Sequence, residues 1–420
     1  MTLAIRAHDS IHAFDDAAWE ALVAHTRGAT PFVYKGFLSA LEDAGTVGGR
    51  TGWRPHYLAA YAPEAADVHG AGATDATGSG QPERLVGVAL GWVKAHSMGE
   101  FVHDWGWAEA AQRAGIAYYP KLVLAVPFTP AVGARLLVDA RLGDAGVRDV
   151  RRALLEAATA SAEALGCSSV HVLFALAEEI DAAAELGFHT RLGCQFHWQD
   201  EGYADFEAFL GRFDSKRRNQ IRRERRRVRE AGVTVHARAG HAIGDELVGP
   251  AHALYGVTVD RYPWGRRYLN RDFFELLWQR MRPALQLLVA TRGAGPAPGE
   301  PFDPGAIVGG SVNLQGLGEG GALRRWGRYW GALADVDALH FEVCSYAAID
   351  DCIRTGVAVF EAGAGGGEHK LGRGFMPFGT RSAHRVFDSR FHAAVGDFCA
   401  REAVAIEADM ARLAREVFAR

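Results

Sequence analysis

Four side chains suited to group-transfer chemistry lie close together near the C-terminus: Glu368, His369, Lys370 and Arg373. They follow a run of glycines that includes Gly366 and Gly367. An imidazole can remove a proton near neutral pH, and cations or loop amides can stabilise a developing oxyanion. Glycines let the backbone approach a phosphate or a carbonyl closely. The segment therefore predicts a binding or catalytic site; the alternative is a glycine turn that ends in solvated charges.

Two apolar runs before these residues predict the strands that position them. Val357–Glu361 ends directly before the glycines, and ligands bind past strand ends in open α/β sheets. Leu339–Tyr346 alternates between apolar and polar residues, which predicts a strand with Glu342 on its polar face. If that polar face looks into the site, Glu342 is a candidate general base, with its pKa raised by partial burial. The alternative is a polar face paired with an arginine.

A strongly basic segment predicts a helix over residues 216–230, with Ser215 as N-cap and Gly232 at its end. Its cations, among them Lys216 and Arg222, far outnumber its acids and would repel one another without anions nearby. A phosphorylated donor such as CoA, an anionic acceptor, tRNA or a lipid headgroup would meet that need. The alternative is a solvated face whose arginines pair with acids elsewhere.

Two aromatic residues stand beside a proline–glycine turn. Tyr262 and Trp264 could line a binding site as an aromatic wall, although aromatic residues more often belong to the core. In the first half, the segment after the strand Leu122–Pro127 contains Pro127 and Pro130, which lack backbone N–H donors. A loop that binds phosphate needs such donors, so the sequence indicates that this segment is disabled or repurposed as a phosphate loop.

The two halves of the chain repeat the same order of predicted elements: a β-hairpin, an aromatic cluster, and then strand, helix and strand. The last three are Leu122–Pro127, Val150–Leu165 and Ser169–Leu176 in the first half, and Leu339–Cys344, Ala347–Thr355 and Val357–Glu361 in the second. An offset of domain size predicts two copies of one α/β domain, residues 1–200 and 201–420. Residues 388–418 predict a closing helix that covers the sheet.

Composition narrows the class of protein. The 420 residues are 49% hydrophobic and 23% charged with a net charge of −4, as expected for a globular protein without a global attraction to nucleic acid. The sequence shows no apolar run that predicts a signal peptide or a membrane span. Five cysteines without CxxC spacing argue against a disulfide framework or a zinc site. We expect a cytoplasmic protein without a metal.

Four motifs, in order, resemble one family: SKRRNQIRRERR, YPWGRRYLNRDFFE, FEVCSY and FEAGAGGGEHKLGRGFMP. The chain resembles the FemAB-like predicted N-acyltransferases, a GNAT-superfamily group described as peptidoglycan biosynthesis/recognition. The resemblance implies an α/β (α+β) fold of two tandem GNAT-like domains, with mixed, mostly antiparallel sheets flanked by helices. The glycine loop departs from the family pattern, being one glycine longer and lacking its glutamine.

The resemblance also implies transfer of an acyl or aminoacyl group to an amine, with no permanently bound cofactor. Acyl-CoA is favoured over aminoacyl-tRNA as co-substrate, because the long helical arm of the tRNA-dependent Fem ligases is not evident in the sequence. A peptide or glycopeptide amine is the expected acceptor, and tRNA is a possible partner. Glu342, Glu368 and His369 are the candidate catalytic residues. The candidate binding residues are Lys370, Arg373, Tyr262, Trp264, Lys216, Arg222, Gly366 and Gly367.

Two alternative functions remain at this point. One is a non-catalytic GNAT-like module that binds an anionic or glycopeptide ligand, because fold does not fix function. The other is nucleic-acid binding by the basic helix, which predicts an affinity that falls steeply with salt.

Overall fold

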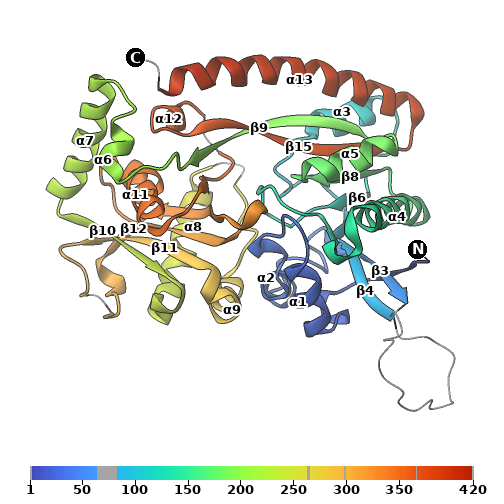
Figure 1. Ribbon diagram of the computed structural model, residues 1–420, viewed down its shortest axis with the longest axis horizontal. Helices are drawn as coiled ribbons and strands as arrows, with labels where there is room; N and C mark the ends of the chain where they lie inside the picture. Colours follow the sequence, from blue (N-terminus) through green and yellow to red (C-terminus); the bar gives the residue numbers. More distant parts are fainter. Residues whose placement is uncertain (1, 64–82, 263–264, 298, 366, 419–420) are drawn as a thin grey trace, which may run out of the picture.

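The computed structural model describes residues 2–63, 83–262, 265–297, 299–365 and 367–418. Its centre is an eleven-stranded sheet in the order β10-β11-β12-β13-β14-β9-β15-β8-β6-β5-β2, with helices on both faces (Figure 1). A second sheet, β1-β3-β4-β7, is formed entirely by the first half. The predicted fold class, mixed α/β with mostly antiparallel sheets flanked by helices, is confirmed.

The first half of the chain contributes strands to both sheets. These strands are β1 (Ala4–His8), β2 (Trp53–Pro55), β3 (Tyr57–Pro63), β4 (Glu83–Ala89), β5 (Gly91–Lys94), β6 (Lys121–Leu124), β7 (Leu136–Val138), β8 (Ser169–Leu173) and β9 (His189–Gln199). Its helices are α1 (Asp16–Ala24), α2 (Lys35–Asp43), α3 (Trp105–Arg113), α4 (Gly143–Ala164) and α5 (Ala177–Glu185).

The second half contributes strands to the large sheet alone. These strands are β10 (Val233–Ala239), β11 (Leu285–Arg292), β12 (Ile307–Leu317), β13 (Leu323–Ala332), β14 (Val359–Glu361) and β15 (Met376–Val386). Its helices are α6 (Phe206–Leu210), α7 (Ser215–Glu230), α8 (Val248–Asp260), α9 (Arg271–Met281), α10 (Leu339–Phe341), α11 (Ala347–Thr355), α12 (Glu368–Leu371) and α13 (Ser389–Val417).

The two halves exchange their last strands. Each half has one parallel pair, β6 with β8 and β13 with β14. Strand β9 leaves the first half and pairs with β14, whereas β15 leaves the second half and pairs with β8. The exchanged strands pair with each other from Met376 opposite His197 to His384 opposite His189. The sheet is therefore continuous across the predicted domain boundary, which itself stays a prediction.

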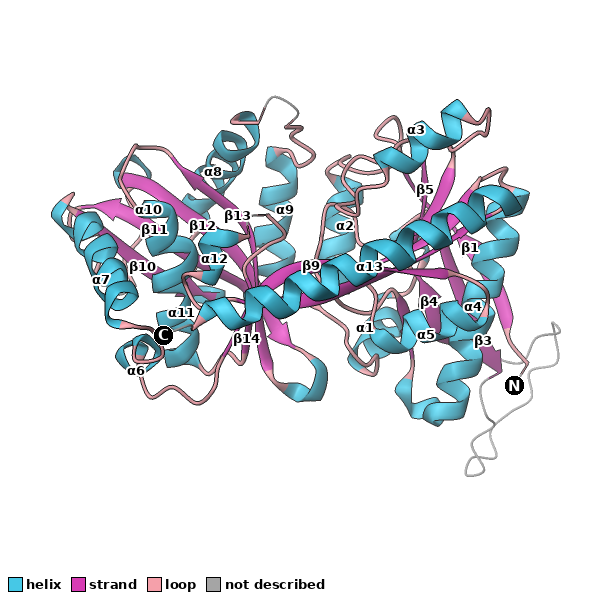
Figure 2. Ribbon diagram, turned by 90° about the horizontal axis from the view of Figure 1, so that it is seen from above, coloured by secondary structure: helices cyan, strands magenta, loops and turns pink. Residues whose placement is uncertain are grey.

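Helix α13 lies along the exchanged strands and packs on both of them (Figure 2). It runs from Ser389 to Val417, within one residue of the predicted 388–418 at each end, and its N-cap is the side chain of Asp388. The buried side of the helix carries Phe391, Val395 and Cys399. Its apolar residues thus cover the seam between the two halves, as the spacing predicts.

The predicted strand Leu339–Tyr346 is wrong, because this segment is helical. It forms α10 and a π-helical turn, Glu342–Tyr346, that runs directly into α11. Leu339, Val343 and Tyr346 are at most 2% exposed, and their spacing of four and three residues is the helical period. The strand that pairs in parallel with β14 is β13, which contains the aromatic cluster expected to precede that strand.

Candidate active site

A cavity of about 1070 Å³ lies where the exchanged strands meet both halves. Its wall is formed by Gly193 and Gln195 of β9 and by Thr380 and Ser382 of β15, and loops of both halves surround it. Exposed aromatic side chains of both halves line the same cavity: Phe101, Trp105 and Tyr262. A cavity of this size can hold a drug-sized molecule and buries most of its surface.

Three predicted site residues line the cavity: Tyr262, His369 and Lys370. The segment Ala362–Gly365 forms the adjacent wall, so the glycine loop lies at the cavity as predicted. Trp264 and Gly366 lie outside the described residues. Glu368 begins α12, but its side chain is not among those described. The remaining predicted residues do not line the cavity: Glu342, Arg373, Lys216, Arg222 and Gly367.

Lys370 is a buried cation without a carboxylate partner among the described residues. Its ammonium donates a hydrogen bond to the carbonyl oxygen of Gly363 at 2.6 Å, which ties α12 to the start of the glycine loop. Burial lowers the pKa of Lys370 to about 8, and the nearest titratable group that opposes this shift is the Cys344 thiol. Burial raises the pKa of that thiol, so it stays neutral. The charge of Lys370 is therefore available to a bound molecule.

His369 is half-buried beside Lys370 and faces His340, with the two ring centroids 5.6 Å apart. Burial, together with the nearby charges of Lys370 and Arg373, lowers the pKa of His369. Burial also lowers the pKa of His340 to about 4. Both rings are neutral at pH 7, and a neutral imidazole can accept a proton.

Arg373 holds α12 in place from behind the cavity. Its guanidinium forms an ion pair with Glu224 of α7 at 2.9 Å and donates to the carbonyl oxygen of His369 at 2.6 Å. The same group lies 3.3 Å from the centroid of the Phe341 ring. Because all these contacts are within the protein, Arg373 positions His369 and Lys370 rather than facing the cavity.

Glu342 points away from the cavity, towards the basic helix. It forms an ion pair with Arg225 of α7 at 3.2 Å. Burial raises its pKa although Arg225 opposes the shift, and its Oε2 atom has no hydrogen-bond partner. The geometry corresponds to the alternative stated for this residue, a polar face paired with an arginine.

The predicted basic helix is confirmed as α7, with one correction at its start. Asp214, not Ser215, is the N-cap: its carboxylate accepts from the backbone N–H of Arg217 at 2.7 Å. A carboxylate suits this place because it also offsets the positive end of the helix dipole. At the other end, Gly232 follows the helix with a φ of +71°, as predicted.

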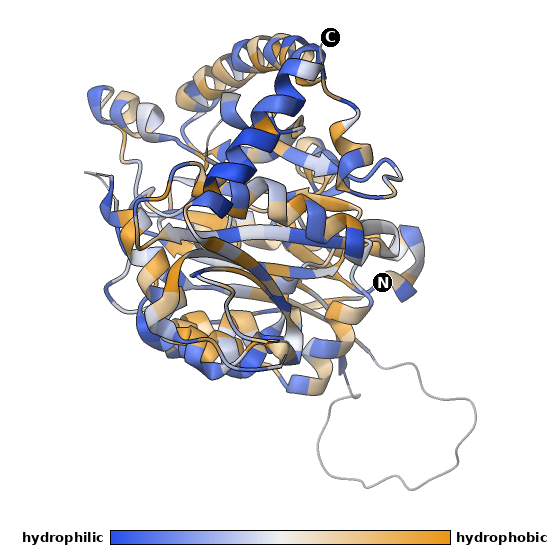
Figure 3. Cartoon of the chain, turned by 90° about the vertical axis from the view of Figure 1, so that its left-hand side faces the viewer, coloured by the Kyte–Doolittle hydropathy of each residue, from blue (hydrophilic) through white to orange (hydrophobic). Residues whose placement is uncertain are grey.

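The cations of α7 fall into two groups. Arg222 pairs with Glu207 at 2.5 Å and Arg227 with Asp337 at 2.9 Å, whereas Lys216 has no ion-pair partner among the described residues. The exposed side of the helix is strongly hydrophilic (Figure 3). This surface stands apart from the residues that line the cavity.

Several polar residues of the cavity wall were not predicted: Arg191, Gln195, Asn313, Arg328 and Arg381. Arg191 pairs with Glu402 of α13 at 2.6 Å. Arg381 has no side-chain partner among the described residues. The sequence offered one signal for these residues, because some of them are polar residues inside otherwise apolar strands. That they line the same cavity depends on the strand exchange.

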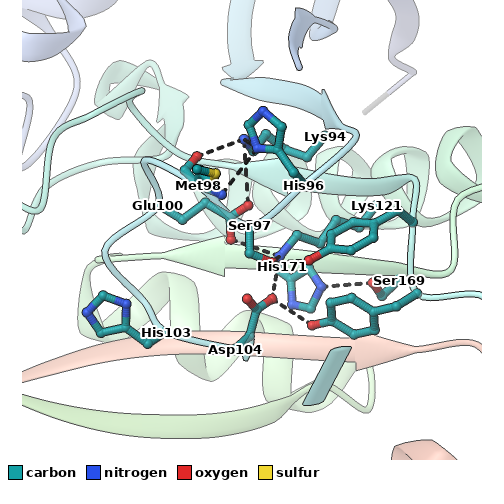
Figure 4. Close-up of polar contacts among 12 residues, drawn as sticks. Lys94, His96, Ser97, Met98, Glu100, His103, Asp104, Lys121, Ser169 and His171 are labelled. Carbon is teal, nitrogen blue, oxygen red and sulfur yellow. Dashed lines mark hydrogen bonds and ion pairs between the residues drawn. The ribbon is translucent and has the colours of Figure 1, made fainter. Parts of the chain in front are cut away.

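A second set of charged residues lies buried in the first half, beside the cavity (Figure 4). The ammonium of Lys121 contacts Glu100 at 2.8 Å and Ser97 at 3.0 Å, and it also pairs with Asp104. Although burial opposes ionisation of Asp104, Lys121 holds the pKa of that carboxyl well below its usual range. Burial lowers the pKa of neighbouring Lys94 to about 7 and raises that of Glu100 to about 7.

Comparison with known proteins agrees with this architecture. A family model described as FemAB-like, peptidoglycan biosynthesis/recognition, matches residues 10–420. The crystal structure of FemX aligns with a TM-score of 0.51 at 11% identity, covering 94% of this chain and 100% of that chain. L-PGS from Bacillus licheniformis aligns with a TM-score of 0.48 at 12% identity, covering 97% and 98%. A search of curated proteins found no match.

No helix in the described part of the chain combines the length and the apolar character needed to cross a bilayer. Within the same residues, no group of three or more His, Cys, Asp or Glu side chains is arranged to hold a metal ion. The five cysteines are free thiols.

Proposed function

Because the chain belongs to the FemAB-like family of peptidoglycan biosynthesis and recognition, we propose that it is an N-acyltransferase. It would move an acyl or aminoacyl group from an activated donor to an amine carried by a peptide or glycopeptide of the cell envelope. One observation carries this proposal. The central cavity collects, on the short helix α12, the neutral imidazole of His369 and the buried ammonium of Lys370, which has no carboxylate partner among the described residues.

Acyl transfer to an amine has two chemical requirements. The amine must lose a proton as it attacks the carbonyl carbon, and the tetrahedral oxyanion must be stabilised until the leaving group departs. In our proposal His369 accepts the proton of the amine. Lys370 donates to the oxyanion, which its lack of a carboxylate partner supports. A preorganised donor of this kind typically contributes about 10²–10³ in kcat.

Other residues are assigned supporting roles. Tyr262 and the neighbouring aromatic residues form an apolar wall for the acyl group. Arg373 fixes α12 through Glu224, so it acts on His369 and Lys370 by positioning them. Glu342 is not given a catalytic role, since its carboxylate is engaged by Arg225. Lys216 and Arg222 are proposed to contact a phosphate of the donor or acceptor from the exposed side of α7.

Acyl-CoA is the donor we propose first, with aminoacyl-tRNA second. The longest described helix, α13, lies along the sheet instead of projecting as an arm. In a direct test, the full chain would be incubated with a panel of acyl-CoA thioesters and amines, and free thiol would be followed. A parallel reaction would contain charged tRNA and a muropeptide amine.

We expect amine-dependent product from one donor class, and its loss in the double variant His369→Gln/Lys370→Met. Wild-type activity in that variant would overturn the assigned chemistry. A chain that binds a muropeptide but turns over neither donor would instead be the non-catalytic binding module.

A further inference from the structure

A row of polar side chains leads from the cavity into the first half of the molecule. Ser382 of β15 lines the cavity, and its hydroxyl lies 2.8 Å from Nε2 of His384. Nδ1 of His384 lies 2.7 Å from Nδ1 of His171 on β8. Nε2 of His171 in turn lies 2.8 Å from the hydroxyl of Ser169, as Figure 4 shows.

The row continues to the surface. The hydroxyls of Ser169 and Ser168 are 3.1 Å apart, and Ser168 donates to the carbonyl oxygen of Tyr118 at 2.5 Å. Both histidines are 1% exposed and Ser169 is fully buried, whereas Ser168 is partly exposed. Four hydrogen-bond contacts therefore connect the cavity wall to a residue that water can reach.

Strand pairing explains why these residues meet. His384 and His171 are directly opposite each other in the antiparallel pair of β15 and β8. Ser382 and Ser169 each stand two residues from their histidine, and residues two apart share one face of a strand. The chain of contacts exists only because the two halves exchange strands, since it joins groups 213 residues apart.

The hydrogen atoms of this row of polar side chains can be arranged in two ways. Burial lowers the pKa of His171 to about 3 and that of His384 well below its ordinary value, so each ring is neutral with one N–H and one bare nitrogen. If His384 carries its proton on Nδ1, every donor points towards Ser168. If His171 carries its proton on Nδ1, the donors point back towards Ser382. The first arrangement satisfies every contact. The second keeps the four contacts from Ser382 to Ser168, but Ser168 then donates to Ser169 instead of to the carbonyl oxygen of Tyr118, so a change of direction requires this hydroxyl to turn.

The proposed reaction produces a proton that must leave the cavity. An activated acyl compound and an ammonium give an amide, the protonated leaving group and one free proton. Bound substrates would fill the cavity and hinder exchange with bulk water. A path through the wall would then be the route for that proton.

We propose that Ser382, His384, His171, Ser169 and Ser168 form a proton path from the cavity to the surface, an inference that rests on the proposed function. The proton that His369 accepts is passed on within the cavity, which both residues line, to Ser382, and the hydroxyl proton of Ser382 passes to His384 Nε2. The Nδ1 proton of His384 passes to His171, the Nε2 proton of His171 to Ser169, and a hydroxyl proton to Ser168 and water. Each proton transfer along the row switches both histidines to the opposite tautomer. The row can carry another proton once its hydroxyl and N–H protons have returned to their first arrangement.

The first experiment does not need activity. Protein labelled with ¹⁵N-histidine would be used to measure exchange of the shared imidazole N–H with water by NMR, assigned by its loss in His384→Gln. We expect exchange to slow by at least about tenfold in the double variant Ser168→Ala/Ser382→Ala. Ser161→Ala on α4 is the matched control. It removes a hydroxyl that also contacts a histidine, His56 at 2.6 Å, but does not belong to the proposed proton path, so the exchange should stay unchanged.

The second experiment uses the transfer reaction. Ser168→Ala should lower kcat without raising KM and should enlarge the solvent isotope effect, although Ser168 does not line the cavity. Unchanged exchange in the double variant, or an unchanged kcat in Ser168→Ala, would overturn the path. If no donor is turned over, the proposed function fails, whereas the exchange experiment still decides whether the chain conducts protons.

Discussion

Two buried lysines, one in each half, show how differently the same charge can be used. Lys121 on β6 contacts two carboxylates and a hydroxyl, and all of them are buried with it. Lys370 on α12 is buried to a similar degree but donates to one carbonyl oxygen and has no carboxylate partner among the described residues. Its pKa is lowered to about 8, whereas Glu100 and Asp104 outweigh burial and raise that of Lys121.

The difference indicates separate roles. A buried cation that is fully paired holds its surroundings together, and removing it leaves uncompensated charge. A buried cation that lacks its counterion costs stability, and such a cost is typical of a site that stabilises a bound anion or a transition state. We therefore expect Lys121 to matter for stability and Lys370 for activity.

Replacing Lys121 should have the largest effect. Lys121→Met leaves Asp104 buried without its cation and Glu100 with Lys94 alone, 3.9 Å away, which should lower the free energy of unfolding by about 3–5 kcal/mol. Urea unfolding followed by fluorescence would measure this. Arg226→Met, which removes an exposed ion pair with Glu230, is the control and should change stability by less than about 0.5 kcal/mol. A loss of less than about 1 kcal/mol in Lys121→Met would remove the distinction between the two lysines.

Replacing Lys370 should affect the reaction instead. Lys370→Met removes a buried charge that no carboxylate balances among the described residues, so the fold should be at least as stable as the wild type. Loss of the oxyanion donor should lower kcat by about 10²–10³. Transfer kinetics and urea unfolding on the same sample would test both statements. A variant that unfolds more easily and keeps its kcat would assign Lys370 a structural role.

The pH dependence of stability should distinguish the same two lysines. The unfolded state keeps a lysine protonated up to about pH 10.5, whereas native Lys370 loses its proton near pH 8. Between these values the unfolded state binds more protons, so the contribution of Lys370 to the unfolding free energy rises with pH, by at most about 1.4 kcal/mol per unit. The difference between the wild type and Lys370→Met should therefore rise from pH 8 to 10. A flat difference would show that Lys370 is not desolvated.

The local parts of this architecture were accessible from sequence. Helix α11 begins and ends at the predicted residues Ala347 and Thr355, and the glycine loop lies at the cavity because its charges and its position after β14 are both local features. The helical segment that begins at Leu339 could also have been identified. Its buried residues repeat with the helical period, a signal that the apparent alternation in a short window concealed.

The strand exchange could not be predicted in this way. Gln195 and Ser382 reach one cavity only because β9 and β15 pair with each other, and the choice of partner for a strand depends on contacts far apart in sequence. The two histidines of the proposed proton path depend on the same pairing. The sequence therefore predicted that the glycine loop lies at a site but did not predict the strands that complete the cavity wall.

The exposed cations of α7 complete the comparison and should give the smallest effects. Lys216 and Arg222 are exposed, and water screens their charges, so replacing both with alanine should change the unfolding free energy by less than about 1 kcal/mol. If they contact a phosphate of the donor, KM should rise, by less in high salt, and kcat should stay constant. Arg412→Ala on α13, which removes an exposed pair with Glu416, is the matched control. A fall in kcat instead would mean that α7 affects the reacting groups through the ion pair of Glu224 with Arg373. Burial would then be insufficient to tell a charge that positions the site from a charge that binds the substrate.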